Sequence, residues 1–494
     1  MKKAIVIGSG FAGMSAASFM AKAGWDVTIL EKNSMPGGRG RKFSADGFVF
    51  DMGPSWYWMP DIFENYFQQF GKKVSDYYQL IRLDPSYSVQ YADQAIDIPA
   101  DYESLQSLFE SIEKGSAAKL DQFLKEAAFK YDVGINKLVQ KPGRSLTEFL
   151  DIDLAKGLLK LDVFTSMKKH VRKYFKHPKL IQLMEFPVLF LGALPADIPA
   201  LYSLMNYADI KLGTWYPQGG MYNIADAMFQ LATELGVKFE FDCNVTKIDV
   251  NNNIANKVTA NKNGSIHQYD ADVVIGGADY HFIESSLLDA TYQSYSADYW
   301  NSRVMAPSCL IYYVGLNKRL ENITHHTLFF DVDFDNHGKE IYADPQWPSQ
   351  PLFYVSATSV TDDSVAPQGC ENLFFLVPIA SGLQGDDETL RERYFEMIVK
   401  RYESKIGQKI SDAIVYKKSY AVSDFKNDYN AFKGNAYGLA NTLMQTSILK
   451  PSLKSKKVKN LFYTGQLTVP GPGVPPSLIS GQVVAKEILK KFNS

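Results

Sequence analysis

The sequence predicts an α/β protein in which a Rossmann-like nucleotide-binding domain carries an inserted mixed-sheet domain and a mainly helical region. Three observations predict this fold. A glycine-rich β-α-β unit opens the chain, a strand with a Pro/Gly loop and a helix closes it, and the residues between them change from helix-rich to strand-rich. The 494 residues, of which 46% are hydrophobic and 21% charged, suffice for about three structural units.

The opening unit is recognisable from its apolar pattern. Residues 3–7 form a short apolar run that predicts a strand, residues 13–23 are rich in small side chains and predict a helix, and residues 26–31 predict a second strand. A strand, a helix and a strand this close together indicate parallel pairing of the two strands.

The turn between the first strand and the helix carries Gly8, Gly10 and Gly13 in the spacing G-x-G-x-x-G. Glycines at these positions permit a tight turn and bring a pyrophosphate close to the helix N-terminus. Glu31 ends the second strand, where a carboxylate can accept hydrogen bonds from a ribose. The unit predicts a dinucleotide site, and a purely structural glycine-rich turn is the alternative.

The domain boundaries follow from changes in pattern along the chain. Charged helix formers recur from residue 101, and a Pro/Gly turn followed by an amphipathic helix and short strands begins at Tyr216. Strand-like runs recur again between residues 300 and 449. We expect a discontinuous nucleotide-binding domain of residues 1–75, 216–295 and 450–494, a second domain of 76–100 and 296–449, and a mainly helical region of 101–215.

Composition excludes several classes of function. A net charge of −2 gives no broad basic face, so we expect no nucleic-acid partner. Three widely spaced cysteines argue against a disulfide framework and favour a reducing, cytoplasmic setting. No apolar run reaches the roughly 20 residues that a membrane-spanning helix needs. His325 and His326 are adjacent on a predicted strand and therefore point to opposite faces, so we expect no metal site there.

Two further segments carry a resemblance to a known superfamily. Residues 36–39, Pro-Gly-Gly-Arg, and residues 47–54, which end in Gly53-Pro54, resemble the amine oxidase and carotenoid desaturase flavoproteins. The resemblance implies FAD as the cofactor. It also implies cofactor contacts from Gly38, Arg39, Ser55, Trp56 and Val245, the last at the adenine end.

The C-terminal segment resembles the closing flavin motif of the same superfamily. Residues 460–465 predict a strand that ends at Gly465, and residues 471–475 predict the Pro/Gly entry to a last helix. By the resemblance, Gly465 and Val474 contact the flavin. The loop departs from the common form at Gln466, Thr468 and Pro476.

Several internal stretches resemble the bacterial-type phytoene desaturases within this superfamily, among them residues 216–221, 315–317, 325–327 and 361–370. The resemblance implies a carotenoid substrate and desaturation of phytoene toward neurosporene or lycopene. A later step, such as 3,4-desaturation of a hydroxylated carotenoid, is an alternative. A flavin-dependent lipid-binding or isomerising protein without net oxidation is an alternative from another class.

The implied reaction passes a hydride to flavin N5 and releases the adjacent hydrogen as a proton. Glu148 falls where these desaturases carry a carboxylate proposed for acid–base work, and an exposed helix-face charge is its alternative interpretation. The sequence leaves oxygen and a quinone open as electron acceptors.

A basic run suggests how such a protein reaches a lipid-soluble substrate. Lysines and arginines interleaved with aromatic side chains recur between residues 168 and 179 and are able to rest on anionic headgroups. A solvated helix face is the alternative. Peripheral contact with a membrane surface is therefore an expectation of the sequence. The members of this basic run are Lys168, Lys169, Arg172, Lys173, Lys176 and Lys179.

Overall fold

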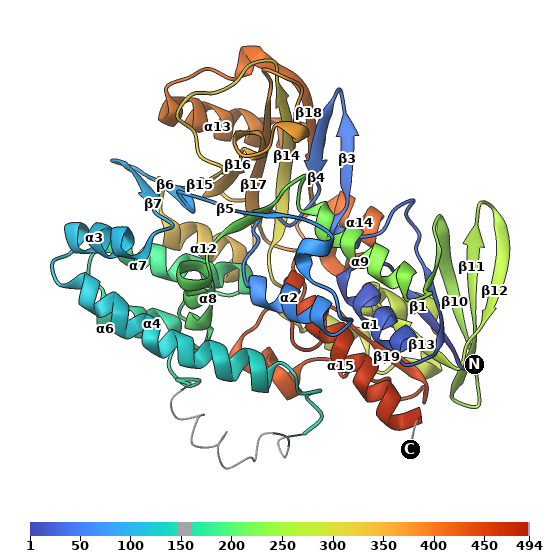
Figure 1. Ribbon diagram of the computed structural model, residues 1–494. Helices are drawn as coiled ribbons and strands as arrows, with labels where there is room; N and C mark the ends of the chain where they lie inside the picture. Colours follow the sequence, from blue (N-terminus) through green and yellow to red (C-terminus); the bar gives the residue numbers. More distant parts are fainter. Residues whose placement is uncertain (146–147, 149–160, 493–494) are drawn as a thin grey trace.

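A computed structural model describes residues 1–145, 148 and 161–492 of the chain. Residues 149–160 of the expected helical region lie outside the described residues. Figure 1 shows three parts: a parallel sheet with its helices around the two termini, a tall mixed sheet beside it, and an outer group of helices. The α/β fold expected from the sequence is confirmed.

The parallel sheet has five strands in the order β19-β13-β1-β2-β9. Its strands β1, β13 and β19 are short, mostly buried apolar runs, as expected for a sheet covered on both faces, whereas the edge strand β9 is Lys-Phe-Glu. β1 and β2 fall within a residue of their predicted ends, and the predicted helix begins two residues earlier than expected, at Phe11. The strands are β1 (Lys3–Ile7), β2 (Asp26–Leu30), β9 (Lys238–Glu240), β13 (Val273–Gly276) and β19 (Leu461–Tyr463).

Helices from both ends of the chain cover this sheet. α1 (Phe11–Lys22) packs against α15 (Val474–Phe492) and against α9 (Tyr222–Glu234). The N-terminal segment is therefore packed against the C-terminal helix, and Figure 1 places both termini on the same side of the molecule. α2 (Pro60–Gln68) lies near the same helices.

A three-stranded antiparallel sheet extends from the nucleotide-binding part. It comprises β10 (Cys243–Asn251), β11 (Ile254–Lys262) and β12 (Ser265–Asp270). The sequence predicts strands at residues 245–250 and 256–260, within β10 and β11, and gives no signal for β12. Nearly all side chains of β12 are exposed, so it has no apolar alternation by which a strand is recognised.

The mixed sheet has seven strands in the order β18-β14-β17-β16-β15-β6-β7. β15 and β6 pair in parallel and the other neighbours are antiparallel. Strands from before residue 101 thus join strands from after residue 300, although the exact domain boundaries stay a prediction. The strands are β6 (Tyr87–Tyr91), β7 (Ala95–Ile98), β14 (Ser308–Leu316), β15 (His326–Phe330), β16 (Phe353–Ser356), β17 (Glu371–Ile379) and β18 (Ile414–Tyr420).

Helices pack against the mixed sheet and close its core. α13 (Glu388–Ile406) buries Tyr394, Phe395 and Ile398 in the same apolar cluster as β14 and β17. α12 (Phe334–Tyr342) contacts β17, and α14 (Val422–Tyr429) contacts β14 and β18. Two small sheets pair β3 (Lys42–Ala45) with β4 (Phe48–Asp51), and β5 (Leu80–Arg82) with β8 (Trp215–Pro217).

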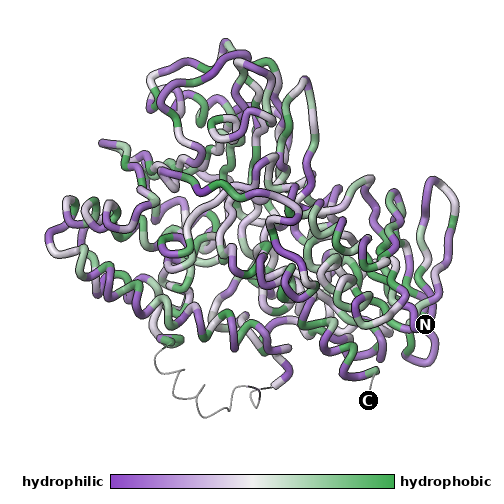
Figure 2. The backbone as a smooth tube through the Cα atoms, viewed as in Figure 1, coloured by the Kyte–Doolittle hydropathy of each residue, from purple (hydrophilic) through white to green (hydrophobic). Residues whose placement is uncertain are grey.

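The outer helices come from the region expected to be helical. They include α3 (Tyr102–Ile112), α4 (Ser116–Val133), α6 (Met167–Tyr174), α7 (Pro178–Glu185), η5 (Phe186–Leu191) and α8 (Leu204–Tyr207). Figure 2 shows hydrophilic and hydrophobic positions alternating along these helices. Within the described ranges, no helix combines the length and apolarity that crossing a membrane requires.

Candidate functional site

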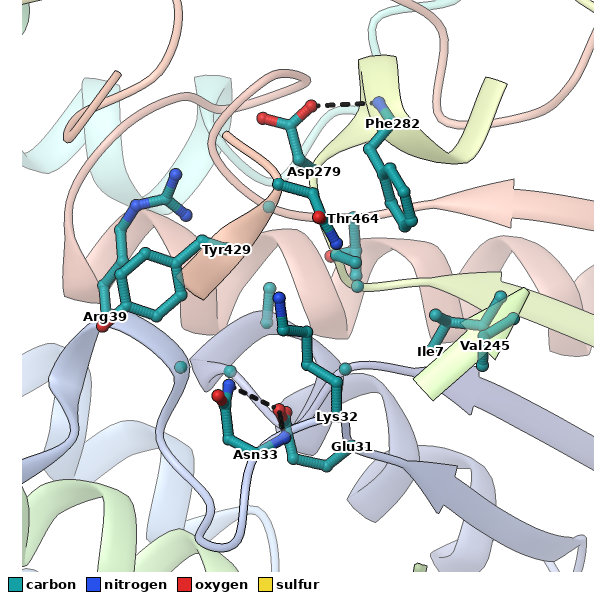
Figure 3. A pocket seen from close by; sticks show the side chains of 18 of the residues that line it. Ile7, Glu31, Lys32, Asn33, Arg39, Val245, Asp279, Phe282, Tyr429 and Thr464 are labelled. Carbon is teal, nitrogen blue, oxygen red and sulfur yellow. Dashed lines mark hydrogen bonds between the residues drawn. The ribbon is translucent and has the colours of Figure 1, made fainter. Parts of the chain in front are cut away.

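An open cavity lies at the carboxyl ends of the parallel strands (Figure 3). It is lined by residues that follow β1, β2, β13 and β19, together with residues 428–430 at the end of α14. Ligands of open parallel sheets bind at this edge, where neighbouring strands send their connections to opposite faces. The first cavity therefore has the position expected of a nucleotide site.

The glycine turn forms the floor of this cavity. Gly8 has a φ of +95° and donates its N–H to the Leu30 carbonyl at 2.8 Å. A Cβ on Gly13 would lie 2.2 Å from the Gly8 carbonyl oxygen, so a side chain there would collide with backbone. α1 begins directly after Gly10 without a side-chain cap, which leaves its first N–H groups free to bind an anion at the cavity.

A second glycine loop lies against the first. Gly37 donates its N–H to the Ser9 carbonyl at 2.9 Å, and a Cβ on Gly38 would lie 3.1 Å from the Gly10 Cα. Gly38 and Arg39 both line the cavity. The Pro-Gly-Gly-Arg segment singled out in the sequence therefore faces the phosphate-binding turn.

Glu31 is buried at the end of β2 and receives four hydrogen bonds. One carboxylate oxygen accepts from the Ser9 N–H and hydroxyl, both at 2.8 Å. The other accepts from the Asn33 N–H at 2.8 Å and from its side-chain amide at 2.9 Å (Figure 3). The Asn33 amide is a side-chain donor, so a ribose hydroxyl is able to take its place without moving the backbone.

Arg39 lies across the cavity from Glu31. Its guanidinium group donates to the Asn435 carbonyl at 3.1 Å and stacks 5.1 Å from the centre of the Tyr429 ring, while its Nε has no partner among the described residues. Burial lowers the pKa of Arg39, and the nearby Asp279 carboxylate opposes that shift. A buried guanidinium with an unused donor is suited to an anionic or carbonyl ligand.

The remaining predicted cofactor residues take different positions. Val245 on β10 and Gly465 after β19 line the first cavity. Val474 is the first residue of α15, whose Ser477 also lines that cavity. Gly13 lies beneath the turn, where it allows α1 to approach β1. Ser55 and Trp56 line a separate cavity.

This second cavity lies between the mixed sheet and the outer helices. Apolar and aromatic side chains dominate its wall, and three of its polar side chains have partners within the protein. Tyr342 donates to the Leu189 carbonyl at 2.9 Å, Tyr354 lies 2.6 Å from His326 Nδ1, and His337 Nε2 lies 2.9 Å from the Pro378 carbonyl. Such a wall selects a ligand by shape and apolar surface.

Two backbone contacts join the cavities. A Cβ on Gly53 would lie 2.3 Å from the Arg39 carbonyl oxygen, so the segment leading to Ser55 packs directly on the wall of the first cavity. A Cβ on Gly438 would lie 2.7 Å from the carbonyl oxygen of Gln466, which lines the first cavity, while Tyr437 lines the second. The two cavities are therefore neighbours.

Glu148 lies away from both cavity walls. Its two carboxylate oxygens accept hydrogen bonds from the N–H groups of Gly143 and Arg144, at 3.0 and 3.1 Å. The carboxylate thus holds a turn, and its acid–base role stays a prediction. The residues directly around it, Leu146, Thr147 and Phe149, lie outside the described residues.

The adjacent histidines have separate structural partners. His325 Nδ1 lies 2.7 Å from the Thr361 hydroxyl, and His326 stacks on Trp56 with ring centres 4.3 Å apart. Burial lowers the pKa of His325 to about 3. Both rings are therefore neutral at pH 7 and serve the packing beside the second cavity.

One cluster of potential metal ligands joins α4 to α6. Glu126, Asp162 and His170 approach one another there. The Lys130 ammonium lies 3.0 Å from Asp162 and 3.3 Å from His170 Nε2. Because the Lys130 ammonium already holds Asp162 and His170, the cluster is organised as a partly buried ion-pair network.

Asn33, Asp279 and Tyr429 are among the residues of the first cavity that sequence reasoning missed. Asp279 follows β13 after Gly276 and Gly277, and glycines at the end of a predicted parallel strand were an available signal for it. Tyr429 ends α14, far from the parallel sheet in sequence, so no local pattern could have identified it.

Comparisons with known proteins agree with this arrangement. The family model described as flavin containing amine oxidoreductase matches residues 11–489. The chain is 41% identical to a carotenoid 3,4-desaturase of Haloarcula japonica, covering 98% of this chain and 97% of the relative. It is 29% identical to a zeta-carotene-forming phytoene desaturase of Myxococcus xanthus, covering 99% and 94%.

Solved structures share the fold at low sequence identity. An oxidoreductase from Methanosarcina mazei superposes with a TM-score of 0.64 at 17% identity, covering 98% of this chain and all of that one. Cyclohexylamine oxidase from Brevibacterium oxydans superposes with a TM-score of 0.58 at 12% identity, and both chains are fully covered.

Proposed function

We propose that this protein, which belongs to the flavin-containing amine oxidoreductases and, within them, to the carotenoid desaturases, removes hydrogen from a carotenoid with FAD as its cofactor. The observation that carries the substrate proposal is the apolar second cavity directly beside the nucleotide site. A polyene carries no charge and little polarity. The wall of the second cavity is correspondingly apolar.

The residues of the first cavity fit FAD. The unpartnered Arg39 Nε and the free N–H groups at the start of α1 are suited to a diphosphate, and Glu31 to the adenosine ribose. Gly10 and Gly38 leave backbone bare where a side chain would narrow the cavity. Ser55 and Trp56, between the cavities, are placed for the end of the cofactor that meets the substrate.

When bound, FAD supplies the hydride acceptor for oxidation of a carbon–carbon bond. The protein's contribution is alignment and exclusion of water. Aromatic side chains such as Phe186, Phe330 and Tyr354 fix the position of a long apolar chain, and a dry wall keeps water from the reacting carbon. Delocalisation along the polyene stabilises positive charge there, so one weak base suffices for the proton.

The substrate we propose first is phytoene, converted toward neurosporene or lycopene. The second candidate is the 3,4-desaturation of a later carotenoid, which is favoured by the 41% identity to a carotenoid 3,4-desaturase, against 29% to a phytoene desaturase. Tyr342 and His337 on the wall of the second cavity have protein partners, which is compatible with a hydrocarbon in this part of the site.

Pigment analysis tests this function. The gene is expressed in a host that makes phytoene and, separately, in one that makes a hydroxylated carotenoid, and the pigments are identified. New double bonds with phytoene support the first candidate, and new 3,4 double bonds support the second. Unchanged pigments in both hosts, with FAD bound, would instead favour a lipid-binding or isomerising role. Reoxidation of the purified flavoprotein by oxygen or by a quinone then identifies the electron acceptor.

Glu148 is our proposed proton acceptor, carried over from the resemblance. Glu148→Gln keeps one acceptor oxygen for the turn at Gly143 and removes the base. Loss of desaturation at least a hundredfold, with flavin content and thermal stability unchanged, would support the role. Retained activity would assign the carboxylate to the turn alone.

Contact with a membrane surface is proposed through α6 and the segment before it. In the basic run, Arg172 pairs with Glu185 and Lys179 pairs with Asp93, while Lys169 and Lys173 are exposed. Phe164, just before α6, is 89% exposed. An exposed aromatic side chain beside free cations is suited to anionic headgroups.

Flotation with anionic liposomes tests the contact. The double variant Lys169→Glu/Lys173→Glu should lose binding, whereas Lys400→Glu on α13 should keep it. Equal flotation of all three proteins would contradict the proposal and leave the active site as described.

A further inference from the structure

Lys450 is buried without a partner among the described residues. Its side chain is 5% exposed, and its Nζ makes no hydrogen bond. Beside it, Asn441 is 3% exposed and its Oδ1 is likewise unpartnered. Buried polar groups in proteins are nearly always hydrogen-bonded, so two neighbouring exceptions indicate a ligand or a function.

Both side chains converge on the loop that leads into α15. A Cβ on Gly471 would lie 2.9 Å from Asn441 Oδ1 and 3.4 Å from Lys450 Nζ. Gly471 stands two residues before Gly473, whose carbonyl accepts the first hydrogen bond of the helix, from Ser477. Ser477 lines the first cavity, so the first turn of α15 faces the nucleotide site.

Two positive electrostatic sources therefore lie at one place. The N-terminus of a helix carries about half a positive charge. The nearby ammonium has no counter-ion to offset its burial, and burial alone lowers the pKa of Lys450 to about 7. Two like-signed sources without an anion between them are unfavourable, whereas an anion at this position would relieve both.

The segment before Lys450 also ties this position to the substrate side. Asn441 donates its backbone N–H to the Leu191 carbonyl at 3.0 Å. Leu191 ends η5, the short helix that supplies Phe186 and Leu189 to the wall of the second cavity. The Lys450–Asn441 pair therefore lies between the nucleotide site and the apolar site, where a flavin ring has to meet its substrate.

We propose that Lys450, held beside the Asn441 amide and acting with the N-terminus of α15, stabilises the negative charge that the flavin ring acquires when it is reduced. A flavin that accepts a hydride from a neutral donor becomes an anion, and positive charge near its ring favours that form. Lys450 therefore acts through its charge on the flavin and takes no part in the transfer of hydrogen. The inference rests on FAD binding and is independent of which carotenoid is oxidised.

The test measures the midpoint potential of the bound flavin by equilibrium with a reference dye, without any carotenoid. In Lys450→Met, the ratio of reduced to oxidised flavin at a fixed potential should fall about tenfold, which is about 30 mV for a two-electron couple. Lys450→Arg should retain most of the wild-type potential. Lys457→Met removes the same charge from an exposed position and should leave the potential unchanged.

Thermal stability separates this role from a structural one. Replacing an unpaired buried ammonium by an apolar side chain of similar length should leave the FAD-free protein equally stable or more stable. A potential in Lys450→Met equal to that of the wild type would overturn the proposal, as would a lower potential that Lys457→Met reproduces. If Lys450→Met does not retain flavin, Lys450→Gln is measured in the same way and judged by the same outcomes.

A failed pigment assay would leave this measurement intact, because the potential is read from the flavin itself. Conversely, an unchanged potential in a protein that still desaturates carotenoids would remove the role of Lys450 and leave the proposed function standing. If a water molecule bridges Lys450 and Asn441 and neither side chain influences the flavin, the potential of Lys450→Met should equal that of the wild type.

Discussion

Ser9 donates two hydrogen bonds to one oxygen of Glu31, from its backbone N–H and from its hydroxyl, both at 2.8 Å. This contact fixes the glycine turn to the end of β2. Glu31→Gln would place an amide where two carboxylate oxygens now face four donors, so at least one donor would lose its acceptor. We expect FAD affinity to fall at least tenfold, measured by titrating the FAD-free protein and following flavin fluorescence.

The control for Glu31 is Glu396→Gln, an exposed change on α13 with the same loss of charge. Its FAD affinity should match that of the wild type. If Glu31→Gln also binds FAD with wild-type affinity, the carboxylate serves only to hold the turn, and the ribose contact implied by the resemblance is wrong.

We expect substitutions of the two glycines around the start of α1, Gly10 and Gly13, to have different effects. In Gly13→Ala the new Cβ would lie 2.2 Å from the Gly8 carbonyl oxygen, and overpacking of this kind costs about 1–3 kcal/mol. In Gly10→Ala the Cβ meets no protein atom within 4 Å and projects at the cavity wall. We expect Gly13→Ala to unfold more easily, and Gly10→Ala to keep its stability but bind FAD at least tenfold more weakly.

Denaturant unfolding of the FAD-free proteins, beside FAD titrations, separates these effects. Equal destabilisation by both alanines would contradict the assignment of Gly10 to the cofactor and Gly13 to packing.

The glycines of the turn show which features of the site can be predicted from the sequence. Spacing alone placed Gly8, Gly10 and Gly13 at a strand–helix turn, because their need for bare backbone is local. Ser55 and Trp56 were placed at the cofactor by resemblance, and the structure puts them on the wall of the apolar cavity. That position depends on β15, β16 and η5, which lie far away in sequence.

The same limit applies to polar partners. Glu148 was singled out from its position in the chain, but its hydrogen bonds to Gly143 and Arg144 depend on a turn that no periodic pattern marks. Nothing in the sequence indicates that Lys450 is buried, because a lysine in a Lys/Ser-rich stretch is expected to be exposed. Only the packing of Asn441 and Gly471 around it reveals that it is buried.

Asp209 predicts a pH dependence of stability. Burial raises the pKa of Asp209 to about 7, although Tyr87 donates to its carboxylate at 2.8 Å. In the unfolded chain its pKa is about 3.9. Between these values the native state binds more protons than the unfolded state, so the free energy of unfolding falls as pH rises from about 4 to 7.

Asp209→Asn removes this ionisation and keeps an acceptor for Tyr87. We expect the variant to gain thermal stability over the wild type at pH 8 and to gain little at pH 5, with a difference on the order of a few kcal/mol. Melting temperatures of both flavin-loaded proteins at the two pH values measure it. The same difference between variant and wild type at both pH values would mean that the protonation state of Asp209 does not change between them.

Ile341 tests whether the apolar cavity is the substrate site. It lies on α12, lines the second cavity and is partly exposed, so a larger side chain can be accommodated without collapse of the core. Ile341→Trp should fill part of the cavity and lower kcat/KM for the carotenoid at least tenfold, because a chain recognised by shape has no polar contact to compensate. Flavin content should not change, since the nucleotide site lies beyond Ser55.

Lys339→Trp adds the same ring to an exposed position of α12 and should leave kcat/KM unaltered. Equal activity in both variants would place the carotenoid outside the cavity.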